Sequence, residues 1–124
     1  MGVEETGDVV VVDILPGILE KDFAEIQKKA AQVKGLVDWL HVDVLDNTLI
    51  KNITYNEWDT FKPVAAEFHL EAHLMVLHPQ KYLAPLTACG FKRLVAHVEA
   101  DHIREFLIEG RKFGIELGVA IDGP

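Results

Sequence analysis

The sequence has little of several features that mark other classes of protein. Cysteine occurs once, at Cys89, so no disulfide can form within the chain and a reducing compartment is expected. No apolar run reaches the roughly 18 residues of a membrane helix. The first residues, MGVEETGD, lack the basic and then apolar order of a signal peptide. These features predict a cytoplasmic protein that does not associate with a membrane.

Basic residues are scarce as well. Lys and Arg number 12 against 20 Asp and Glu, which gives a formal net charge of −8. Nucleic acids are bound by clustered Lys and Arg, so we expect no nucleic-acid partner. A small anionic substrate stays open, because local groups can hold it against the overall charge. The 124 residues, 49% of them hydrophobic, predict a single domain over residues 1–124.

Predicted strands and helices alternate along the chain. Short β-branched or apolar runs predict strands, and apolar residues at helical spacing predict helices. The expected strands cover residues 8–15, 37–45, 68–77, 92–100 and 115–124. The expected helices cover residues 21–35, 58–66, 79–90 and 101–114. Alternation with short connections predicts parallel strands wound with helices.

Individual residues are expected to mark the helix ends. Asp22 lies in the first predicted turn of its helix, and Asp101 is a candidate N-cap. Gly35 and Gly114 are placed to end their helices. Pro63 either begins or interrupts its helix.

Three of the strands have one apolar and one polar face when read with a period of two. The expected apolar faces hold Leu40, Val42 and Val44, then Leu70, Ala72, Leu74 and Val76, then Leu94, Ala96, Val98 and Ala100. The opposite faces hold Trp39, His41, Asp43 and Leu45, then His69, Glu71, His73 and Met75, then Arg93, Val95, His97 and Glu99. A doubly wound sheet would need two apolar faces, whereas a barrel has an inner face whose upper layer forms a site. The pattern predicts an α/β fold of the (β/α)8-barrel type, with the polar residues facing inward.

His41, Asp43 and His73 stand near the carboxyl ends of two strands that should be neighbours. Two imidazoles and a carboxylate suit a divalent ion such as Zn, Mn, Fe or Co. The alternative is that each histidine is a core residue satisfied by hydrogen bonds. His97 and Glu99 are either partners that orient the ligands or a buried pair.

Three stretches, HVDVLDNTLIKNIT, AHLMVLHPQKYL and AHVEA, resemble the ribulose-phosphate 3-epimerase family of (β/α)8 barrels. The resemblance runs from LPGILEKDF to LGVAIDGP. It implies that His41, Asp43 and His73 bind a divalent metal, together with a second Asp late in the barrel. It also implies that Asp43 is an acid/base catalyst in the interconversion of D-ribulose 5-phosphate and D-xylulose 5-phosphate through an enediolate. Two carboxylates would flank the reacting carbon, each with its pKa lifted toward neutrality.

Some positions depart from the pattern of that family. Gly17 and Glu20 stand where the family usually has Ser, and Leu45 and Asn47 where it has Met and Gly. Leu49, Ile50 and Lys51 replace a Phe-Val-Pro run. Gly17, Asn47 and Met75 are the residues that the resemblance places beside the phosphosugar substrate. The departures at Gly17 and Asn47 leave the identity of that substrate open.

The chain is also short for a barrel, which needs roughly 250 residues on average. It supplies about four and a half βα units, so the second Asp and the phosphate site should come from the missing half. We therefore expect the chain alone to be inactive. A half-barrel has two open sheet edges, here residues 9–15 and 115–121, and an inner face that exposes Leu15, Met75 and Val95. We expect a homo-oligomer.

Two other functions are compatible with the pattern. A half-barrel could bind a metal or a partner without catalysis. A related barrel could carry out an aldol or decarboxylation step on a phosphosugar, but that branch often uses an Asp-x-Lys motif, which does not occur here.

Overall fold

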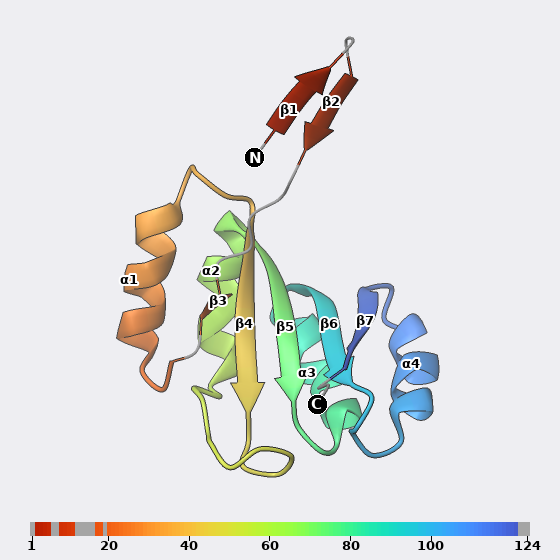
Figure 1. The fold of residues 1–124 in the computed structure, drawn as a ribbon. Coiled ribbons are helices and arrows are strands. Elements are labelled where there is room, and N and C mark those ends of the chain that lie inside the picture. Colours follow the sequence, from red (N-terminus) through yellow and green to blue (C-terminus); the bar gives the residue numbers. More distant parts are fainter. Residues whose placement is uncertain (1, 6–7, 12–16, 19, 122–124) are drawn as a thin grey trace.

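A five-stranded parallel sheet forms the centre of the computed structural model, which describes residues 2–5, 8–11, 17–18 and 20–121. The strand order is β3-β4-β5-β6-β7. These strands are β3 (Gly17–Ile18), β4 (Trp39–Leu45), β5 (His69–Met75), β6 (Phe91–His97) and β7 (Glu116–Ala120). Neighbours in the sheet are consecutive in sequence, and helices connect them from β3 onward (Figure 1). The predicted α/β fold of a partial barrel is confirmed.

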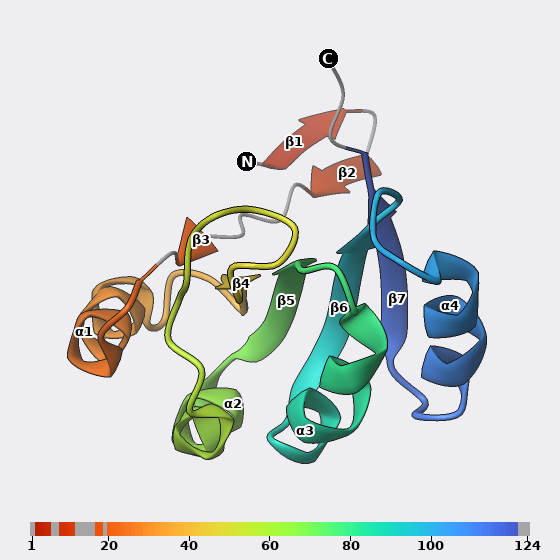
Figure 2. The same cartoon turned by 90° about the horizontal axis from the view of Figure 1, so that it is seen from below.

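Helices lie on the convex side of this curved sheet and leave its concave side open (Figure 2). They are α1 (Phe23–Val33), η1 (Trp58–Phe61), α2 (Lys62–Glu67), η2 (Pro79–Tyr82), α3 (Leu83–Ala88) and α4 (Ile103–Arg111). None of the helices within the described residues combines the length and hydropathy that a membrane span requires.

The hydrophobic core lies between the sheet and the helices. The side chains on the predicted apolar face of β4, β5 and β6 are at most 3% exposed. They are Leu40, Val42, Val44, Leu70, Ala72, Leu74, Leu94 and Ala96. Phe61, Phe91 and Phe106 pack against them from the helices and β6. Burying such side chains stabilises the fold by about 1.5–3 kcal/mol each for the larger ones. The period-two prediction of the apolar face is confirmed for these strands.

Most predicted helix ends are confirmed, with one exception. The Asp22 carboxylate caps α1 by accepting the Ala24 N–H at 3.1 Å, and Pro63 lies in the first turn of α2. Gly35 and Gly114 follow α1 and α4 with φ of +82° and +68°, a conformation that favours glycine.

Asp101 does not cap α4, so that prediction is wrong. His102 is the N-cap, with φ of +53° and no capping bond from its side chain. The Asp101 N–H instead donates to the Leu77 carbonyl at 2.8 Å, which fixes Asp101 one residue too early for a cap.

The amino-terminal strand also differs from the prediction over residues 8–15. Strand β2 (Asp8–Val11) pairs antiparallel with β1 (Gly2–Glu5) and not with β4, and residues 12–15 lie outside the described residues. β-Branched valines favour an extended backbone whichever strand they pair with. Here the pairing strand is β1, which is separated from β2 by only two residues. In the described part of the chain, β4 pairs with β3 on one side and with β5 on the other.

Strand β6 is shorter than expected, because it ends at His97 and not at Ala100. The Ala100 N–H donates to the His97 carbonyl at 3.0 Å, so the chain turns there. Val98 consequently lies 41% exposed instead of facing the helices. The last predicted strand likewise ends early, at Ala120, and residues 122–124 lie outside the described residues.

The loops after β4, β5 and β6 are joined along the carboxyl edge of the sheet. The Thr48 hydroxyl accepts the Leu77 N–H at 2.9 Å, and the Leu77 carbonyl accepts the Asp101 N–H at 2.8 Å. Asp46 accepts hydrogen bonds from Thr48 and, at 2.5 Å, from the Tyr82 hydroxyl. Although burial alone would raise the pKa of Asp46, these bonds and nearby Lys81 hold that pKa below its usual value.

We predict that Asp46→Asn lowers the free energy of unfolding by about 1–2 kcal/mol at neutral pH. A carboxyl whose pKa is lowered on folding stabilises the protein above its unfolded pKa of about 4, and that contribution is lost as the pH falls through the folded value. The difference between wild type and Asp46→Asn should therefore shrink below about pH 4. Urea titrations from pH 3 to pH 7 measure it, with Tyr82→Phe as a second variant. A difference that does not change with pH would contradict the assignment.

Candidate metal centre

The parallel register of β4 and β5 brings the predicted metal ligands together. Asp43 lies directly opposite His73, and His41 lies directly opposite Glu71. In parallel strands, opposite residues point to the same face of the sheet, and here that face is the concave one. His41, Asp43 and His73 are half-buried, with 25%, 19% and 21% of their side chains exposed.

Both imidazoles point at one oxygen of Asp43. His41 Nε2 lies 3.0 Å from Asp43 Oδ1, and His73 Nδ1 lies 3.2 Å from the same atom. One potential ligand atom from each of the three residues lies within 4.8 Å of the other two. The sequence prediction of a convergent His-Asp-His group is confirmed as geometry.

The far nitrogen of each imidazole has its own partner. His41 Nδ1 lies 2.5 Å from Glu71 Oε2. His73 Nε2 lies 2.7 Å from His97 Nε2, and His97 Nδ1 lies 3.3 Å from Glu99 Oε1. In the metal-free protein, His41 Nε2 and His73 Nδ1 can donate to Asp43. With His41 Nδ1 donating to Glu71 and His73 Nε2 donating to His97, both nitrogens would offer a lone pair to a cation that replaces these protons. His97 thus contacts the cluster through His73, and Glu99 contacts His97.

The electrostatics of Asp43 differ from the expectation. Burial alone would raise its pKa, but hydrogen bonds from His41 and His73 outweigh burial and hold the pKa well below its usual value. The pKa of His41 is raised, chiefly by its hydrogen bond to Asp43 and, against the effect of burial, also by Glu71. The expected lift of the Asp43 pKa toward neutrality is wrong for the described chain, because two donors face one carboxylate.

This donor set fits a divalent cation. Neutral imidazole nitrogens and a carboxylate oxygen are ligands for Zn, Mn, Fe and Co, and each imidazole has a hydrogen-bonded partner behind it, as metal-binding histidines usually do. His41 through Nε2, His73 through Nδ1 and Asp43 through Oδ1 are the atoms that would hold the ion.

Two residues beside the cluster, Glu71 and Arg93, had no predicted role. Glu71, 8% exposed, contacts His41 and also accepts from the Arg93 guanidinium at 3.0 Å. Burial alone would raise the pKa of Glu71, but hydrogen bonds from His41 and Arg93 lower it. Both residues were predicted to lie on the inner face. The position of Glu71 two residues before His73 could have indicated that its carboxylate lies near the cluster.

The residues expected beside the substrate lie around the carboxyl end of the sheet. Gly17 is opposite His41 in the β3–β4 register, and a Cβ there would lie 4.0 Å from His41 Cδ2, so a side chain has room. Asn47 adopts φ of +66° in the loop after β4, a conformation that glycine takes more readily. Met75 is the half-buried last residue of β5, opposite Leu45. Apart from the approach of Gly17 to His41, these placements rest on register and chain position.

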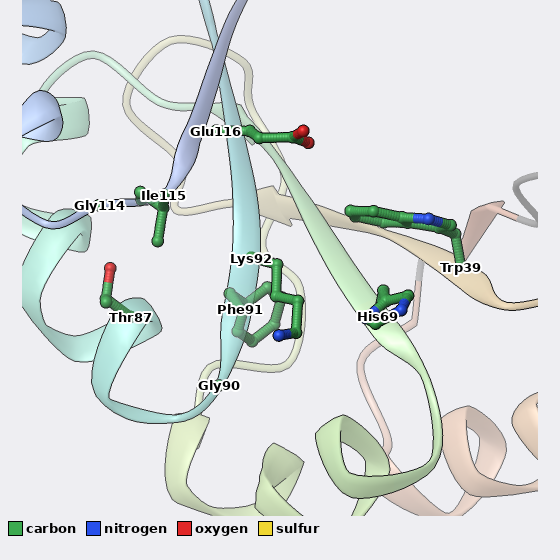
Figure 3. Close-up of a pocket in the computed structure, with 9 residues that line it drawn as sticks. All are labelled: Trp39, His69, Thr87, Gly90, Phe91, Lys92, Gly114, Ile115 and Glu116. Atoms are coloured by element: carbon green, nitrogen blue, oxygen red, sulfur yellow. The ribbon is translucent and has the colours of Figure 1, made fainter.

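A cavity of about 450 Å³ lies at the other end of the strands (Figure 3). Its lining comes mainly from the first residues of β4 to β7 and the adjoining turns, and it includes Trp39, His69, Lys92 and Glu116. The lining includes none of the three candidate ligands, which lie further along β4 and β5 than Trp39 and His69.

Comparison with known proteins identifies the family. Residues 13–123 match the model of the ribulose-phosphate 3 epimerase family. The chain is 34% identical over 120 residues to a ribulose-phosphate 3-epimerase of Rhodobacter capsulatus, with 90% of this chain and 50% of that protein covered. The corresponding enzyme of Synechocystis sp. is 31% identical over 116 residues, with 88% and 50% covered.

A ribulose-phosphate 3-epimerase named as the cytoplasmic isoform of Oryza sativa is 30% identical over 117 residues, with 87% of this chain and 49% of that protein covered. The chain thus spans about half the length of these curated relatives. The match to the family model nevertheless extends from residue 13 to residue 123. The chain therefore belongs to the ribulose-phosphate 3-epimerase family.

Proposed function

We propose that this chain supplies the metal-binding half of the active site of a ribulose-phosphate 3-epimerase, which interconverts D-ribulose 5-phosphate and D-xylulose 5-phosphate. The observation that carries the proposal is the convergence of His41 Nε2 and His73 Nδ1 on Asp43 Oδ1, with the far nitrogen of each imidazole already hydrogen-bonded. Histidines that were only core residues would not need to bring one ring nitrogen each to the same carboxylate oxygen. The names of the relatives support the choice of reaction.

The reaction requires a proton to leave a carbon beside a ketone and to return on its opposite face. Asp43 is ionised in the described structure, so it can accept that proton, but its lowered pKa makes it a weak base. A divalent ion, when bound, would stabilise the negative charge on the enediolate oxygens. Closing the concave face would remove water from Asp43 and raise its pKa, which would make it a stronger base.

A second acid is needed to return the proton. Glu99 is the rival considered within this chain, but it follows β6, two strands away from Asp43, and it lies against His97. The region that the relatives have in addition would have to provide this acid and the phosphate site.

A second candidate function is a metal-binding or partner-binding half-barrel without catalysis. The lowered pKa of Asp43 favours it, since that shift suits a ligand better than a base. Metal binding is common to both candidates, and turnover separates them.

We predict that wild-type protein retains about one Zn²⁺ or Mn²⁺ per chain after equilibrium dialysis against trace metal. The variant His41→Ala/His73→Ala should retain far less, because only Asp43 remains as a ligand. Three protein ligands bind more weakly than four, so the affinity should be modest.

The matched control is His78→Ala/His102→Ala. These two exposed histidines also flank an aspartate, Asp101, at 3.9 and 3.7 Å, but they are not in the cluster. The control should bind metal as wild type does. Equal retention by all three proteins would exclude His41 and His73 as ligands.

We predict that the 124-residue chain alone shows little or no conversion of D-ribulose 5-phosphate, because one carboxylate removes the proton and no placed acid returns it. A coupled assay for D-xylulose 5-phosphate measures this with metal present. Turnover by wild type that disappears in Asp43→Asn would contradict the prediction and would place a complete site in this chain.

We also propose a homo-oligomer in the cytoplasm. Strand β7 is an edge of the described sheet, and its end exposes Val119 (43%) and Ile121 (76%). Unpaired strand edges with exposed apolar residues favour association. A single cysteine, buried at Cys89, fits a reducing compartment.

Light scattering at micromolar concentration tests the assembly. We expect at least twice the 13.9 kDa mass of the chain, and Val119→Lys should shift the population toward monomer by placing a charge at the edge. A soluble, folded wild-type monomer would contradict the proposal.

A further inference from the structure

We propose that Glu71 is a positioning residue for His41, and that Arg93 holds Glu71 in place. The inference rests on the proposed metal site and adds Glu71 to it, a residue that is not one of the predicted ligands. Glu71 lies on β5 directly opposite His41 on β4, so the sheet itself sets the distance between the two residues.

The Glu71 carboxylate uses its two oxygens for two different partners. Oε2 lies 2.5 Å from His41 Nδ1, and Oε1 accepts from the Arg93 guanidinium at 3.0 Å. An ionised carboxylate can only accept, so Glu71 favours a proton on His41 Nδ1 at 2.5 Å, whereas Asp43 favours one on Nε2 at 3.0 Å. A metal ion in the cluster needs the lone pair of Nε2, so Glu71 favours the tautomer that can bind the ion.

Arg93 is itself held from two further sides. Its guanidinium donates to Glu116 at 2.7 and 2.8 Å and lies 4.1 Å from the centre of the Trp39 ring. Trp39 and Glu116 reach across the concave face from the starts of β4 and β7 (Figure 3). Arg93 on β6 is thus the residue that contacts Glu71, and it lies between residues of β4 and β7.

Burial explains why the carboxylate needs this support. Glu71 is 8% exposed, and a buried carboxylate without a charged partner would be costly. The ion pair of Arg93 with Oε1 offsets this cost, and Oε2 remains free to contact His41. His73 differs, because its far nitrogen faces the neutral or cationic ring of His97 and not a carboxylate directly.

The experiment compares Glu71→Gln with Glu116→Gln. In the first variant the amide has one acceptor oxygen, so it cannot serve both His41 and Arg93. The second makes the same chemical change on Glu116, which contacts Arg93 through Oε2 alone, so one amide oxygen can keep these contacts. Among the described residues, Glu116 forms its side-chain hydrogen bonds with Arg93 and not with His41. Isothermal titration with Zn²⁺ gives the affinity, and ¹⁵N shifts of the His41 ring in the metal-free protein at alkaline pH give the tautomer.

We expect Glu71→Gln to weaken Zn²⁺ binding by about tenfold to 100-fold and to increase the share of the Nε2-protonated tautomer, while Glu116→Gln matches wild type in both. Unchanged affinity and tautomer in Glu71→Gln would overturn the inference, as would equal changes in Glu116→Gln. If wild type binds no Zn²⁺, the proposed metal site fails, and the tautomer shift alone still decides the role of Glu71.

A second variant, Glu71→Asp, tests the inference if Glu71→Gln does not fold. Glu71→Asp keeps the charge that faces Arg93 but is one methylene short of His41. If Glu71→Gln does not fold, Glu71→Asp is expected to show both changes, and wild-type values in that variant would overturn the inference.

Discussion

The register between β4 and β5 is the constraint on which the candidate site depends. It sets Asp43 opposite His73 and His41 opposite Glu71, so two cross-strand pairs define the cluster. A slip of one residue would turn one strand's polar side chains into the core and its valines and leucines toward water. The same buried residues that hold the sheet against its helices, among them Leu40 and Leu70, therefore also fix the separations between the ligand atoms.

The charges on the polar face of the sheet compensate one another. Arg93 lies between Glu71 and Glu116, and Asp43 lies between two imidazoles. Buried ion pairs of this kind contribute little net stability, since desolvation offsets their attraction. Their effect is on geometry, because each side chain has few alternative partners within reach.

The sequence predicted the fold and the shared face of His41, Asp43 and His73 because both follow from the two-residue period of a strand. It did not predict the contact of Glu71 with His41, since that contact depends on which residue of β5 stands opposite His41. Register is a tertiary property, and one sequence carries no direct signal for it. Asp101 was misassigned for a similar reason, because its backbone N–H is bound to Leu77 on another loop. The valines before residue 12 favour a strand in either location, so their pattern alone did not say which strand they would pair with.

The described surroundings of Asp43 make it a weaker base than a free carboxylate. The two imidazoles that would share a metal with Asp43 also lower its pKa, so the arrangement that favours a ligand weakens a base. A bound cation would lower the pKa further, since opposite charge stabilises the carboxylate. Only removal of water or a nearby negative group acts in the other direction, and the burial already present is outweighed by the hydrogen bonds from His41 and His73. If Asp43 is the base of the proposed epimerase, a structure that closes over the concave face must do more than bring a second acid. It must also desolvate Asp43 enough to restore the basicity that His41 and His73 remove.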